Sequence, residues 1–582
     1  MEKNRFKTKF TVRNSIIILL SILGLIVCIT VLFPQIRRMI MDLLLQITHR
    51  EPPAPEYWIR VFLSYAMGGI CFILFFDFCT LTDSGKLLVQ KVKGEIKHCM
   101  SEINFRSFIK PVLLLSGIYL LGSFTILRAD FYYYFDDLVR SMSGRRLWYP
   151  GSRYISDFLS IFIHADTKIT DISPIPQLIS IIILSVSSVL LVYVLGNKRI
   201  TNIRLLASIP LGLSPYFLAN IAFKYDAPYM ALSILASIVP FLFIDRKKAF
   251  IFCSIISLLI MCMTYQASSG IYPLIAVILC FIDWNNKKKT YKEIIYFLAT
   301  AFFTFCFALL IFRLFFMLQI EGHQNSMHPV NQIVTGTLYN IKEYAIQINN
   351  DFGIIWKAGI ILVITFFIIK STVQSKQKKA VSFIVSIFFI GILFTLSYGV
   401  YPLISNVMFN AYYLYGFGVF LAIICIYIVS DYKKAAIIAV LALNWCFFVF
   451  AISFGNALAD QNRYANFRVG ILLQDLSTLY PDKKKEELFF QINNSIEFTP
   501  VVNNIAKHNP VIKRLVPVHV EENLFSYIYI HNFYNFGKFN SVVFSFHKEY
   551  KDYKKLNLPV VLDSYYHTIQ SDGNHTLVVL KH

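Results

Sequence analysis

Charged side chains are scarce in this sequence. Asp, Glu, Lys and Arg make up 15% of the 582 residues, whereas 56% are hydrophobic and the mean hydropathy is +0.57. At about 150 residues per domain, this length would suit three or four soluble domains, yet no stretch before residue 455 has the composition of one. The low charge content therefore excludes a cytosolic enzyme and indicates a membrane protein.

Cysteine is used in a way that excludes a disulfide framework. Nine of the ten cysteines fall within or at the edge of apolar runs, Cys99 lies in a basic loop, and the last 127 residues contain none. Small extracellular domains that depend on disulfides are instead dense in cysteine. We therefore expect neither a disulfide scaffold nor a Cys/His metal site.

Apolar runs long enough to cross a bilayer recur along the chain. Crossing ~30 Å of hydrocarbon as a helix takes about 20 mostly apolar residues, because lipid offers no partner for a free backbone N–H or C=O group. We predict thirteen spans, at residues 15–33, 57–80, 111–127, 175–195, 203–222, 227–244, 249–266, 270–284, 293–319, 352–369, 380–400, 411–429 and 435–455. The first span lacks a small-x-small cleavage site, so we interpret it as an uncleaved anchor. The predicted fold class is mainly α, a polytopic membrane helix bundle.

Lysine and arginine gather in alternate connections between these runs. The basic segments are the N-terminal tail, the 81–110 loop, Lys198 with Arg199, 246–248, 287–289, 376–379 and 433–434. Short loops rich in these residues stay in the cytoplasm, so the pattern predicts a cytoplasmic N-terminus. The formal net charge of +21 is therefore mainly a signal of topology, and we predict no nucleic-acid partner.

An odd number of spans leaves the C-terminal residues outside the cytoplasm. We divide the chain into a transmembrane domain, residues 1–455, and an extracytoplasmic α+β domain, residues 456–582. The second carries 14 Lys and Arg against 12 Asp and Glu, has a helical pattern over 461–480, and ends in a turn at 571–574 that predicts a hairpin. We find no catalytic motif in it and interpret it as an acceptor-binding or packing domain, with a purely structural cap as the alternative.

The loop after the third span, residues 128–174, combines acidic, basic and aromatic side chains beside the membrane. Its charged cluster consists of Asp130, Asp136, Asp137, Arg128, Arg140, Arg145, Arg146 and Arg153. Outer loops are normally poor in arginine, so this cluster needs a reason. One reason is pairing within a helix, because Arg140 follows Asp136 by four residues and Asp137 by three, a spacing that stabilises a helix by ~0.2 to 0.5 kcal/mol. The aromatic residues would then form only an interfacial belt.

The other reason is a reaction centre at the bilayer surface. A carboxylate can take the proton of a hydroxyl nucleophile, and arginine side chains can hold a phosphate leaving group through paired N–H donors. Aromatic faces suit the apolar faces of sugar rings. This combination indicates transfer of a sugar from a lipid-linked phosphate to an acceptor hydroxyl.

Four segments of the chain carry a family pattern in their order and placement. They are FDDLVR (135–140), DISPIPQ (171–177), LSPYFLANIAFKYDAPYMALS (213–233) and TYQASSGIY (264–272). In these segments the chain resembles the bacterial glucosyltransferases of the Gtr type, membrane enzymes of the wider GT-C class that modify O-antigen. The resemblance covers about residues 110–300. The chain departs from the pattern at Ala219, where Glu is common, and at Lys224, where Arg is usual and only the charge is kept.

The resemblance implies a GT-C-like bundle that works at the outer face of the bacterial inner membrane. The donor would be a glucosyl or other hexosyl unit on polyprenyl phosphate, and the acceptor a lipid-linked or surface glycan such as O-antigen. Membrane lipids, a flippase and a polyprenyl-phosphate glucosyl synthase are the expected partners. Family members place an acidic pair in the first large outer loop, which makes Asp136 and Asp137 the candidates for the catalytic base.

Candidate substrate-binding residues share a polar side chain expected near the same membrane face. They are Asp130, Arg140, Arg145, Arg146, Arg153, Lys224, Tyr225, Asp226, Tyr265, Gln266 and Arg313. Lys224, Tyr225 and Asp226 form a polar triplet between two apolar spans, where an ionisable residue is a functional candidate by default. The alternative is that these charges simply face water.

Three of these candidates have equally plain structural explanations. Tyr265 and Gln266 either line the mouth of the site or satisfy helix ends. Arg313 lies within a predicted span, where it pairs with an Asp, binds a lipid phosphate or extends to the headgroups. We predict no cofactor and assign no metal site, although the sequence leaves a divalent ion open.

Two other classes of membrane protein compete with this interpretation. A lipid-linked glycan flippase or other transporter usually has internal repeats and broken polar helices near the membrane midplane. We find no repeat, and the polar residues gather at one face. An O-antigen polymerase would carry its large loop late in the chain, whereas this cluster lies early. A purely structural membrane protein is the remaining alternative.

Overall fold

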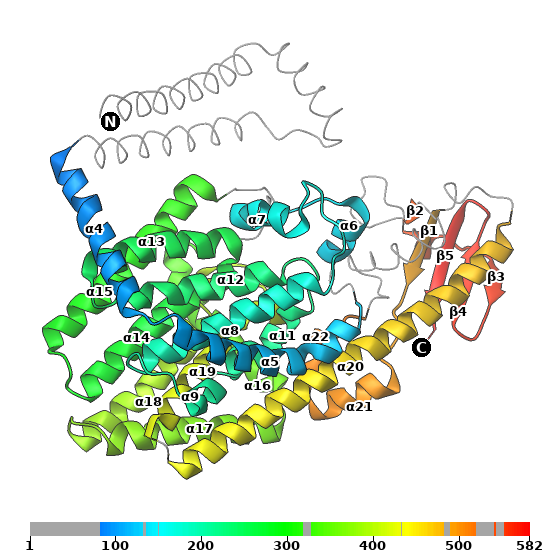
Figure 1. Cartoon of the computed structure of the whole chain (residues 1–582). Coiled ribbons are helices and arrows are strands. Elements are labelled where there is room, and N and C mark those ends of the chain that lie inside the picture. Colours follow the sequence, from blue (N-terminus) through cyan, green and yellow to red (C-terminus); the bar gives the residue numbers. More distant parts are fainter. Residues whose placement is uncertain are drawn as a thin grey trace.

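The computed structural model describes a helical bundle with a small β-sheet at its C-terminal side (Figure 1). The described residues are 82–131, 135–148, 151–317, 327–431, 433–481, 489–518, 541–542 and 552–581. The predicted spans at 15–33 and 57–80 lie outside them, so the fold begins here with helix α4 (Asp83–Glu102).

Eight helices in the described residues are long and apolar enough to cross a membrane. They are α5 (Arg106–Arg128), α8 (Ile175–Leu195), α13 (Lys247–Thr264), α14 (Ile271–Asn285) with the turn η3 (Gln266–Gly270) before it, α15 (Tyr291–Ile311) with the π-helical turn η4 (Phe312–Phe316) after it, α17 (Ile354–Val373), α18 (Lys379–Leu396) and α20 (Lys434–Leu479). Each overlaps a predicted span, and the span at 175–195 is reproduced at both ends. The prediction of a mainly helical membrane protein is confirmed.

The predicted span at 203–222 is instead three short helices. They are α9 (Asn202–Ala207), α10 (Pro210–Leu213) and α11 (Pro215–Ile221). Proline has no N–H group and its ring clashes with the carbonyl four residues earlier, so Pro210 and Pro215 each begin a new helix. Every residue of α10 and α11 is buried, which is the environment in which irregular backbone is tolerated at membrane depth.

Two further predicted spans also correspond to shorter helices. At 227–244 the chain forms α12 (Ala227–Ile238) and the turn η2 (Val239–Phe243), which contains Pro240. At 411–429 the turn η7 (Ala411–Tyr413) comes first, and the helix α19 (Gly416–Ile428) has only 13 residues. Of the eleven predicted spans that lie in the described residues, eight therefore correspond to a helix long enough to cross a membrane, and these three do not, because they are interrupted by proline or begin as an irregular turn.

Small side chains let α8 pack closely at the centre of the bundle. Its Ser180, Ser185 and Ser188 are fully buried, and the helix lies against α5 and α12. The hydroxyl groups of Ser188 and Tyr119 are 2.7 Å apart across the α5 interface. Small and hydroxyl residues allow helices to approach closely in a membrane, where apolar burial alone does not favour helix contact over lipid contact. The ends of α5, α8 and α12 are thereby held together.

Shorter elements fill the connections between the long helices. Between α5 and α8 lie α6 (Phe135–Ser143) and α7 (Tyr154–His164), and between α15 and α17 lie η5 (Val330–Gln332) and α16 (Ile333–Asp351). The turn η6 (Tyr401–Leu403) lies between α18 and η7, and the turn η8 (Val429–Asp431) directly follows α19. Figure 1 shows α6 and α7 together on one side of the bundle.

The C-terminal residues form a five-stranded sheet in the order β2-β1-β5-β4-β3. The strands are β1 (Phe489–Asn493), β2 (Ser541–Val542), β3 (Val560–Asp563), β4 (His567–Ser571) and β5 (His575–Leu580). Strands β4 and β5 pair antiparallel on either side of a turn. In this turn Gly573 has a φ of 90°, a conformation that glycine adopts readily because it has no Cβ atom. The predicted hairpin is confirmed.

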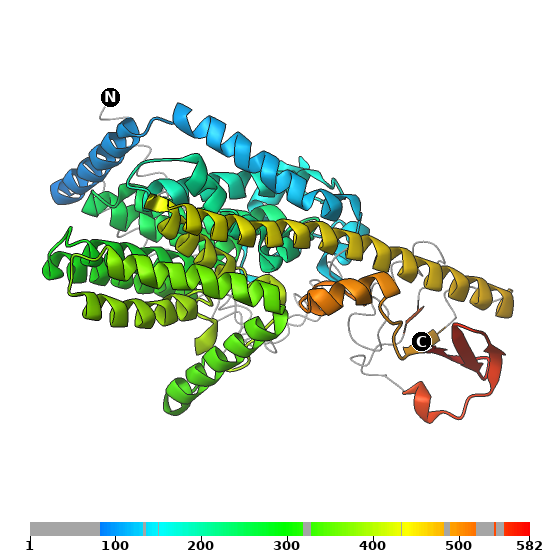
Figure 2. The same cartoon turned by 90° about the horizontal axis from the view of Figure 1, so that it is seen from below.

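Helix α20 connects the bundle to this sheet. It runs without a break through residue 455, packs along α5, and then extends beyond the bundle (Figure 2). Its last turns pack Leu472 and Leu476 against Ile569 and Val578 of the sheet, which form a core separate from that of the bundle. The short helices α21 (Pro500–His508) and α22 (Ile512–Leu515) bury their apolar side chains in the core of the bundle, whereas the turn η12 (Tyr553–Lys555) packs against β5.

Candidate functional site

Asp226 is the centre of a buried cluster formed with the 128–174 loop. Arg140 of α6 forms an ion pair with one of its carboxylate oxygens, and the Trp148 indole donates a hydrogen bond to the other. A guanidinium nitrogen of Arg153 lies 3.9 Å from the same carboxylate. Asp226 immediately precedes α12, so these contacts hold the loop against the start of that helix.

Asp226 stays ionised in spite of its burial. Burial alone would raise the pKa of a carboxyl group, but the charges of Arg140 and Arg153 and the Trp148 hydrogen bond outweigh it and lower the pKa of Asp226. The Arg140 guanidinium also lies 4.4 Å from the centre of the Trp148 ring, and its Nε donates to the Arg146 carbonyl over 3.0 Å. Arg140 therefore pairs with a residue from another segment and not with the acidic pair of its own helix.

Asp137 is fully buried on α6. Its Oδ2 accepts a 2.9 Å hydrogen bond from the backbone N–H of Lys224, while its Oδ1 has no hydrogen-bond partner among the described residues. Burial, and after it the nearby charge of Asp226, raise the pKa of Asp137 to about 7. This carboxyl group connects α6 to the segment before α12, and with this pKa it titrates near neutral pH.

Asp136, the neighbouring residue on α6, is exposed. Consecutive residues on an α-helix point about 100° apart, so the acidic pair divides between the protein interior and the surface. The negative charge of Asp136 acts on both Arg140 and Arg153. Of the two carboxylates, Asp136 is the one that a substrate can reach without a change in the structure.

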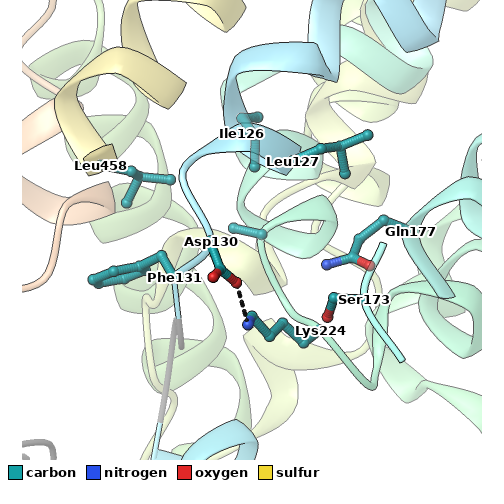
Figure 3. A pocket seen from close by; sticks show the side chains of 9 residues that line it. Ile126, Leu127, Asp130, Phe131, Ser173, Gln177, Lys224 and Leu458 are labelled. Atoms are coloured by element: carbon teal, nitrogen blue, oxygen red, sulfur yellow. Dashed lines mark hydrogen bonds and ion pairs between the residues drawn. The ribbon is translucent and has the colours of Figure 1, made fainter. Parts of the chain in front are cut away.

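Lys224 lines a small pocket where α5, α8 and α20 meet (Figure 3). Its Nζ donates to Asp130 over 2.7 Å and to Asp171 over 2.9 Å. The pocket is lined by Ile126, Leu127, Asp130, Phe131, Ser173, Gln177, Ala222, Lys224 and Leu458. Its free volume is about 10 Å³, close to the room that one water molecule takes.

The two carboxylates beside Lys224 differ in their freedom to move. Asp130 is 83% exposed, whereas Asp171 is 26% exposed and also accepts the backbone N–H of Ser173. Burial opposes ionisation of Asp171, but hydrogen bonds from Ser173 and Lys224 outweigh it and lower the pKa of Asp171 to about 2. The Lys224 ammonium is thus held by one fixed and one exposed partner.

Arg153, Tyr265 and Gln266 meet on the loop side of α13. The Arg153 guanidinium lies 4.6 Å from the centre of the Tyr265 ring, and Gln266 donates to a backbone carbonyl of the loop over 3.0 Å. Tyr265 also stacks on Tyr413 and Tyr415, with ring centres 6.2 and 6.1 Å apart. The TYQASSGIY segment therefore lies against the 128–174 loop.

The remaining predicted residues have other surroundings. Arg145 is exposed, and Arg146 forms a 3.2 Å ion pair with Asp157. Tyr225 is buried and stacks on His164 with ring centres 5.8 Å apart. Arg313 is exposed on the turn η4. Tyr225 packs in one buried cluster with Trp148, and the Arg146 carbonyl accepts from Arg140, so these two border the Asp226 cluster, whereas Arg145 and Arg313 have exposed side chains.

Three residues of the cluster were missed by the sequence analysis. Asp171 and Gln177 lie within the DISPIPQ segment, where polar side chains next to the start of an apolar span were an available signal. Trp148 belongs to the aromatic residues of the 128–174 loop, but nothing local indicated its contact with Asp226, because the two residues lie 78 positions apart. Among the described residues, no three His, Cys, Asp or Glu side chains come together in a way that could hold a metal ion.

The fold and the site define a membrane protein whose acidic and basic side chains converge where several apolar helices end. A family model described as "Glucosyl transferase GtrII" matches residues 124–423, just over half of the chain. The chain belongs to this family. The match confirms the resemblance to Gtr-type glucosyltransferases and includes all four segments on which it rests.

One relative comes from Salmonella phage P22, where it is described as an uncharacterized 55.3 kDa protein in the gtrB 5′ region. The two chains are 31% identical over 188 residues, which is 32% of this chain and 37% of the phage protein. The similarity thus spans little more than a third of the relative. No solved structure matches the chain.

Proposed function

We propose that this chain is a hexosyltransferase that moves a glucosyl unit from polyprenyl phosphate to a lipid-linked or surface glycan such as O-antigen. The observation that carries the proposal is the junction of two family segments, in which Asp137 and Arg140 of α6 contact Lys224 and Asp226. Membership of the GtrII family supports the sugar and the type of reaction.

Asp136 acts as the catalytic base in this proposal. It is exposed, and the acceptor hydroxyl is a much weaker acid than a carboxylic acid, so its proton passes to Asp136 late, as the bond to the anomeric carbon forms. Asp137 is fully buried and held by the Lys224 backbone, which supports a positioning role for it. A single displacement of this kind inverts the anomeric carbon.

Lys224 and Arg153 hold the donor phosphate. Lys224 lines the pocket, and its partner Asp130 is exposed and free to move aside. The Arg153 side chain is 21% exposed, and its Nε has no hydrogen-bond partner among the described residues. Arg140, by contrast, already serves Asp226 and a backbone carbonyl. The phosphate leaves as an anion stabilised by the two cations.

The reaction takes place at the outer face of the bacterial inner membrane, as the alternation of basic loops predicts. In that orientation the N-terminus is cytoplasmic, the 128–174 loop is the catalytic loop of a transmembrane domain, and residues 456–582 form an extracytoplasmic domain that binds the acceptor. A flippase would deliver the lipid-linked donor, and a polyprenyl-phosphate glucosyl synthase would make it.

The test is a transfer assay with purified membranes, polyprenyl-phosphate glucose and a lipid-linked glycan acceptor. We expect Asp136→Asn to lower the rate by about 10²- to 10⁴-fold, the usual contribution of a general base, without a change in unfolding temperature. The matched control is Asp83→Asn, since Asp83 is an exposed acid at the start of α4. Normal transfer by Asp136→Asn would remove the proposed base, and an inactive wild-type chain would remove the proposed reaction.

A flippase is the second candidate, because the short helices α9 to α11 are a broken segment of the kind that transporters use. A flippase would move a lipid-linked glycan between leaflets without forming a glycosidic bond. The same reconstituted membranes separate the two functions when the product glycan is analysed for an added hexose.

A further inference from the structure

The connection between α18 and α19 has no part in the proposed mechanism. Its short turn η7 ends in Tyr412 and Tyr413, two half-buried residues whose ring centres are 4.5 Å apart, with the ring planes at 61° to each other. The turn lies within the part of the chain that the GtrII family model matches, but after all four segments that carry the resemblance. The two rings form a corner, and both remain partly accessible.

Tyr413 lies next to one of the two cations proposed to hold the donor phosphate. Its ring stacks on that of Tyr265, with centres 6.2 Å apart and planes at 21°, and the Arg153 guanidinium lies 4.6 Å from the centre of the Tyr265 ring. Both the Tyr413 hydroxyl and Asp136 act electrostatically on Arg153. The Tyr413 ring and the proposed base are therefore neighbours of the same guanidinium.

Tyr412 packs against the segment that carries the other cation. Its ring lies edge-to-face on Phe223, the residue before Lys224, with centres 5.6 Å apart. Asn410 fixes the corner, because its side-chain amide donates to the Tyr412 hydroxyl over 2.7 Å and its carbonyl accepts the Tyr413 N–H over 2.9 Å. The two rings are thus held in place before a substrate binds, as a precise binding site requires.

A sugar on a phosphate held by Arg153 and Lys224 lies beside these two cations, because its anomeric carbon is bonded to a phosphate oxygen. The face of an aromatic ring carries partial negative charge and attracts the polarised C–H groups on the apolar face of a hexose. We propose that Tyr412 and Tyr413 bind the hexose ring of the polyprenyl-phosphate donor by stacking and so orient its anomeric carbon towards the acceptor hydroxyl. The inference rests on the proposed function.

The test compares two lipids as ligands of the purified chain in detergent, polyprenyl-phosphate glucose and polyprenyl phosphate without a sugar. A ligand that binds only the folded state raises the unfolding temperature as its concentration rises, so such titrations give both affinities. We expect the wild-type chain to bind the glucose-bearing lipid about 10-fold more tightly, a factor of the size that aromatic contacts supply in proteins. The double variant Tyr412→Leu/Tyr413→Leu should lose this preference and keep its affinity for polyprenyl phosphate.

Two further variants separate stacking from packing. Tyr412→Phe/Tyr413→Phe retains both ring faces and should keep the preference. The packing control is Tyr398→Leu, because Tyr398 connects to Tyr413 through the Tyr401 ring but is only 1% exposed. It should lower the unfolding temperature of the free chain through the cavity that it leaves and still prefer the glucose-bearing lipid.

An unchanged preference in the double leucine variant, or no preference in the wild-type chain, would overturn this inference and leave the proposed function intact. Loss of affinity for both lipids in the double leucine variant would assign the two rings to folding or to phosphate binding, and would overturn it as well. So would loss of the preference in the double phenylalanine variant or in Tyr398→Leu. A wild-type chain that binds neither lipid would overturn the proposed function together with this inference.

Discussion

Arg140 and Asp226 are 86 positions apart in the sequence and form an ion pair whose side chains are only 1% and 4% exposed. The pair joins the FDDLVR segment of the loop to the polar triplet before α12. Asp137 of the same helix also binds the Lys224 backbone. Two side chains of α6, one turn apart, thus hold the segment before α12 in place. The geometry of the candidate site depends on this junction.

Removal of Arg140 should destabilise the chain strongly. Arg140→Ala leaves Asp226 buried with only the more distant Arg153, and breaking a buried pair in this way costs about 3 to 5 kcal/mol. Arg140→Lys should recover only part of this loss, because lysine lacks the planar fork that reaches both Asp226 and the Arg146 carbonyl. Thermal unfolding in detergent measures the effect.

The matched control for this prediction is Arg145→Ala, since Arg145 is exposed. The double variant Arg140→Met/Asp226→Leu should be more stable than Arg140→Ala, because no buried charge then lacks a partner. Equal unfolding temperatures for Arg140→Ala and Arg145→Ala would contradict the importance of the buried pair.

The stability of the chain should fall as the pH rises towards neutrality. Because the pKa of Asp137 is about 7 in the fold against 3.8 in an unfolded chain, the folded state keeps a proton that the unfolded state releases between roughly pH 4 and 7. The free energy of unfolding therefore decreases across this interval and levels off above it. Asp137→Asn has no such proton and should show a smaller decrease.

Unfolding temperatures of the wild-type chain and Asp137→Asn, recorded from pH 5 to pH 8, check this prediction. Asp83→Asn is the control, because Asp83 is an exposed carboxylate on α4, and it should follow the wild-type curve. Parallel curves for the wild type and Asp137→Asn would show that Asp137 does not carry the pH dependence.

Gly270 should not tolerate alanine. A Cβ atom at this position would lie 2.1 Å from the carbonyl oxygen of Leu396, whereas one at Gly117 would meet nothing within 4 Å. We expect Gly270→Ala to lower the free energy of unfolding by about 1 to 3 kcal/mol through overpacking. Gly117→Ala, in the middle of α5, should be neutral or stabilise that helix by up to about 1 kcal/mol. Similar unfolding temperatures for the two variants would contradict this close contact.

Arg514 should stabilise the junction between the C-terminal region and the bundle. It forms an ion pair with Asp351, which is 2% exposed at the end of α16 and also accepts a 2.8 Å hydrogen bond from Tyr216 of α11. Arg514→Ala should cost about 3 kcal/mol or more, as for other broken buried pairs. Tyr216→Phe removes one hydrogen bond and should cost about 1 kcal/mol.

Limited proteolysis and thermal unfolding measure this effect together. Lys513→Ala is the control, since Lys513 is the exposed neighbour of Arg514. If Arg514→Ala is cleaved at the same rate as Lys513→Ala and unfolds at the same temperature, the ion pair does not hold the two regions together.

Local sequence features were sufficient where the structure depends on local physics. The span at 175–195 was predicted to the residue because its length and composition alone satisfy the bilayer. The hairpin at residues 571–574 followed from its turn residues. The run at 203–222 was wrong as a single span, because its apolar composition outweighed Pro210 and Pro215 in the prediction.

The sequence by itself determined that this chain is a membrane protein with multiple apolar helices, and its four segments indicated the Gtr-type glucosyltransferases. It also identified charged residues close to apolar spans, where an unpaired charge would be costly to bury. Only the tertiary structure decided who those partners are: Asp226 for Arg140, the Lys224 backbone for Asp137, and Asp171 for Lys224. The reason is that hydrophobic length and helical spacing are local properties, whereas a buried charge is stabilised by whichever distant segment the packing of the helices brings against it.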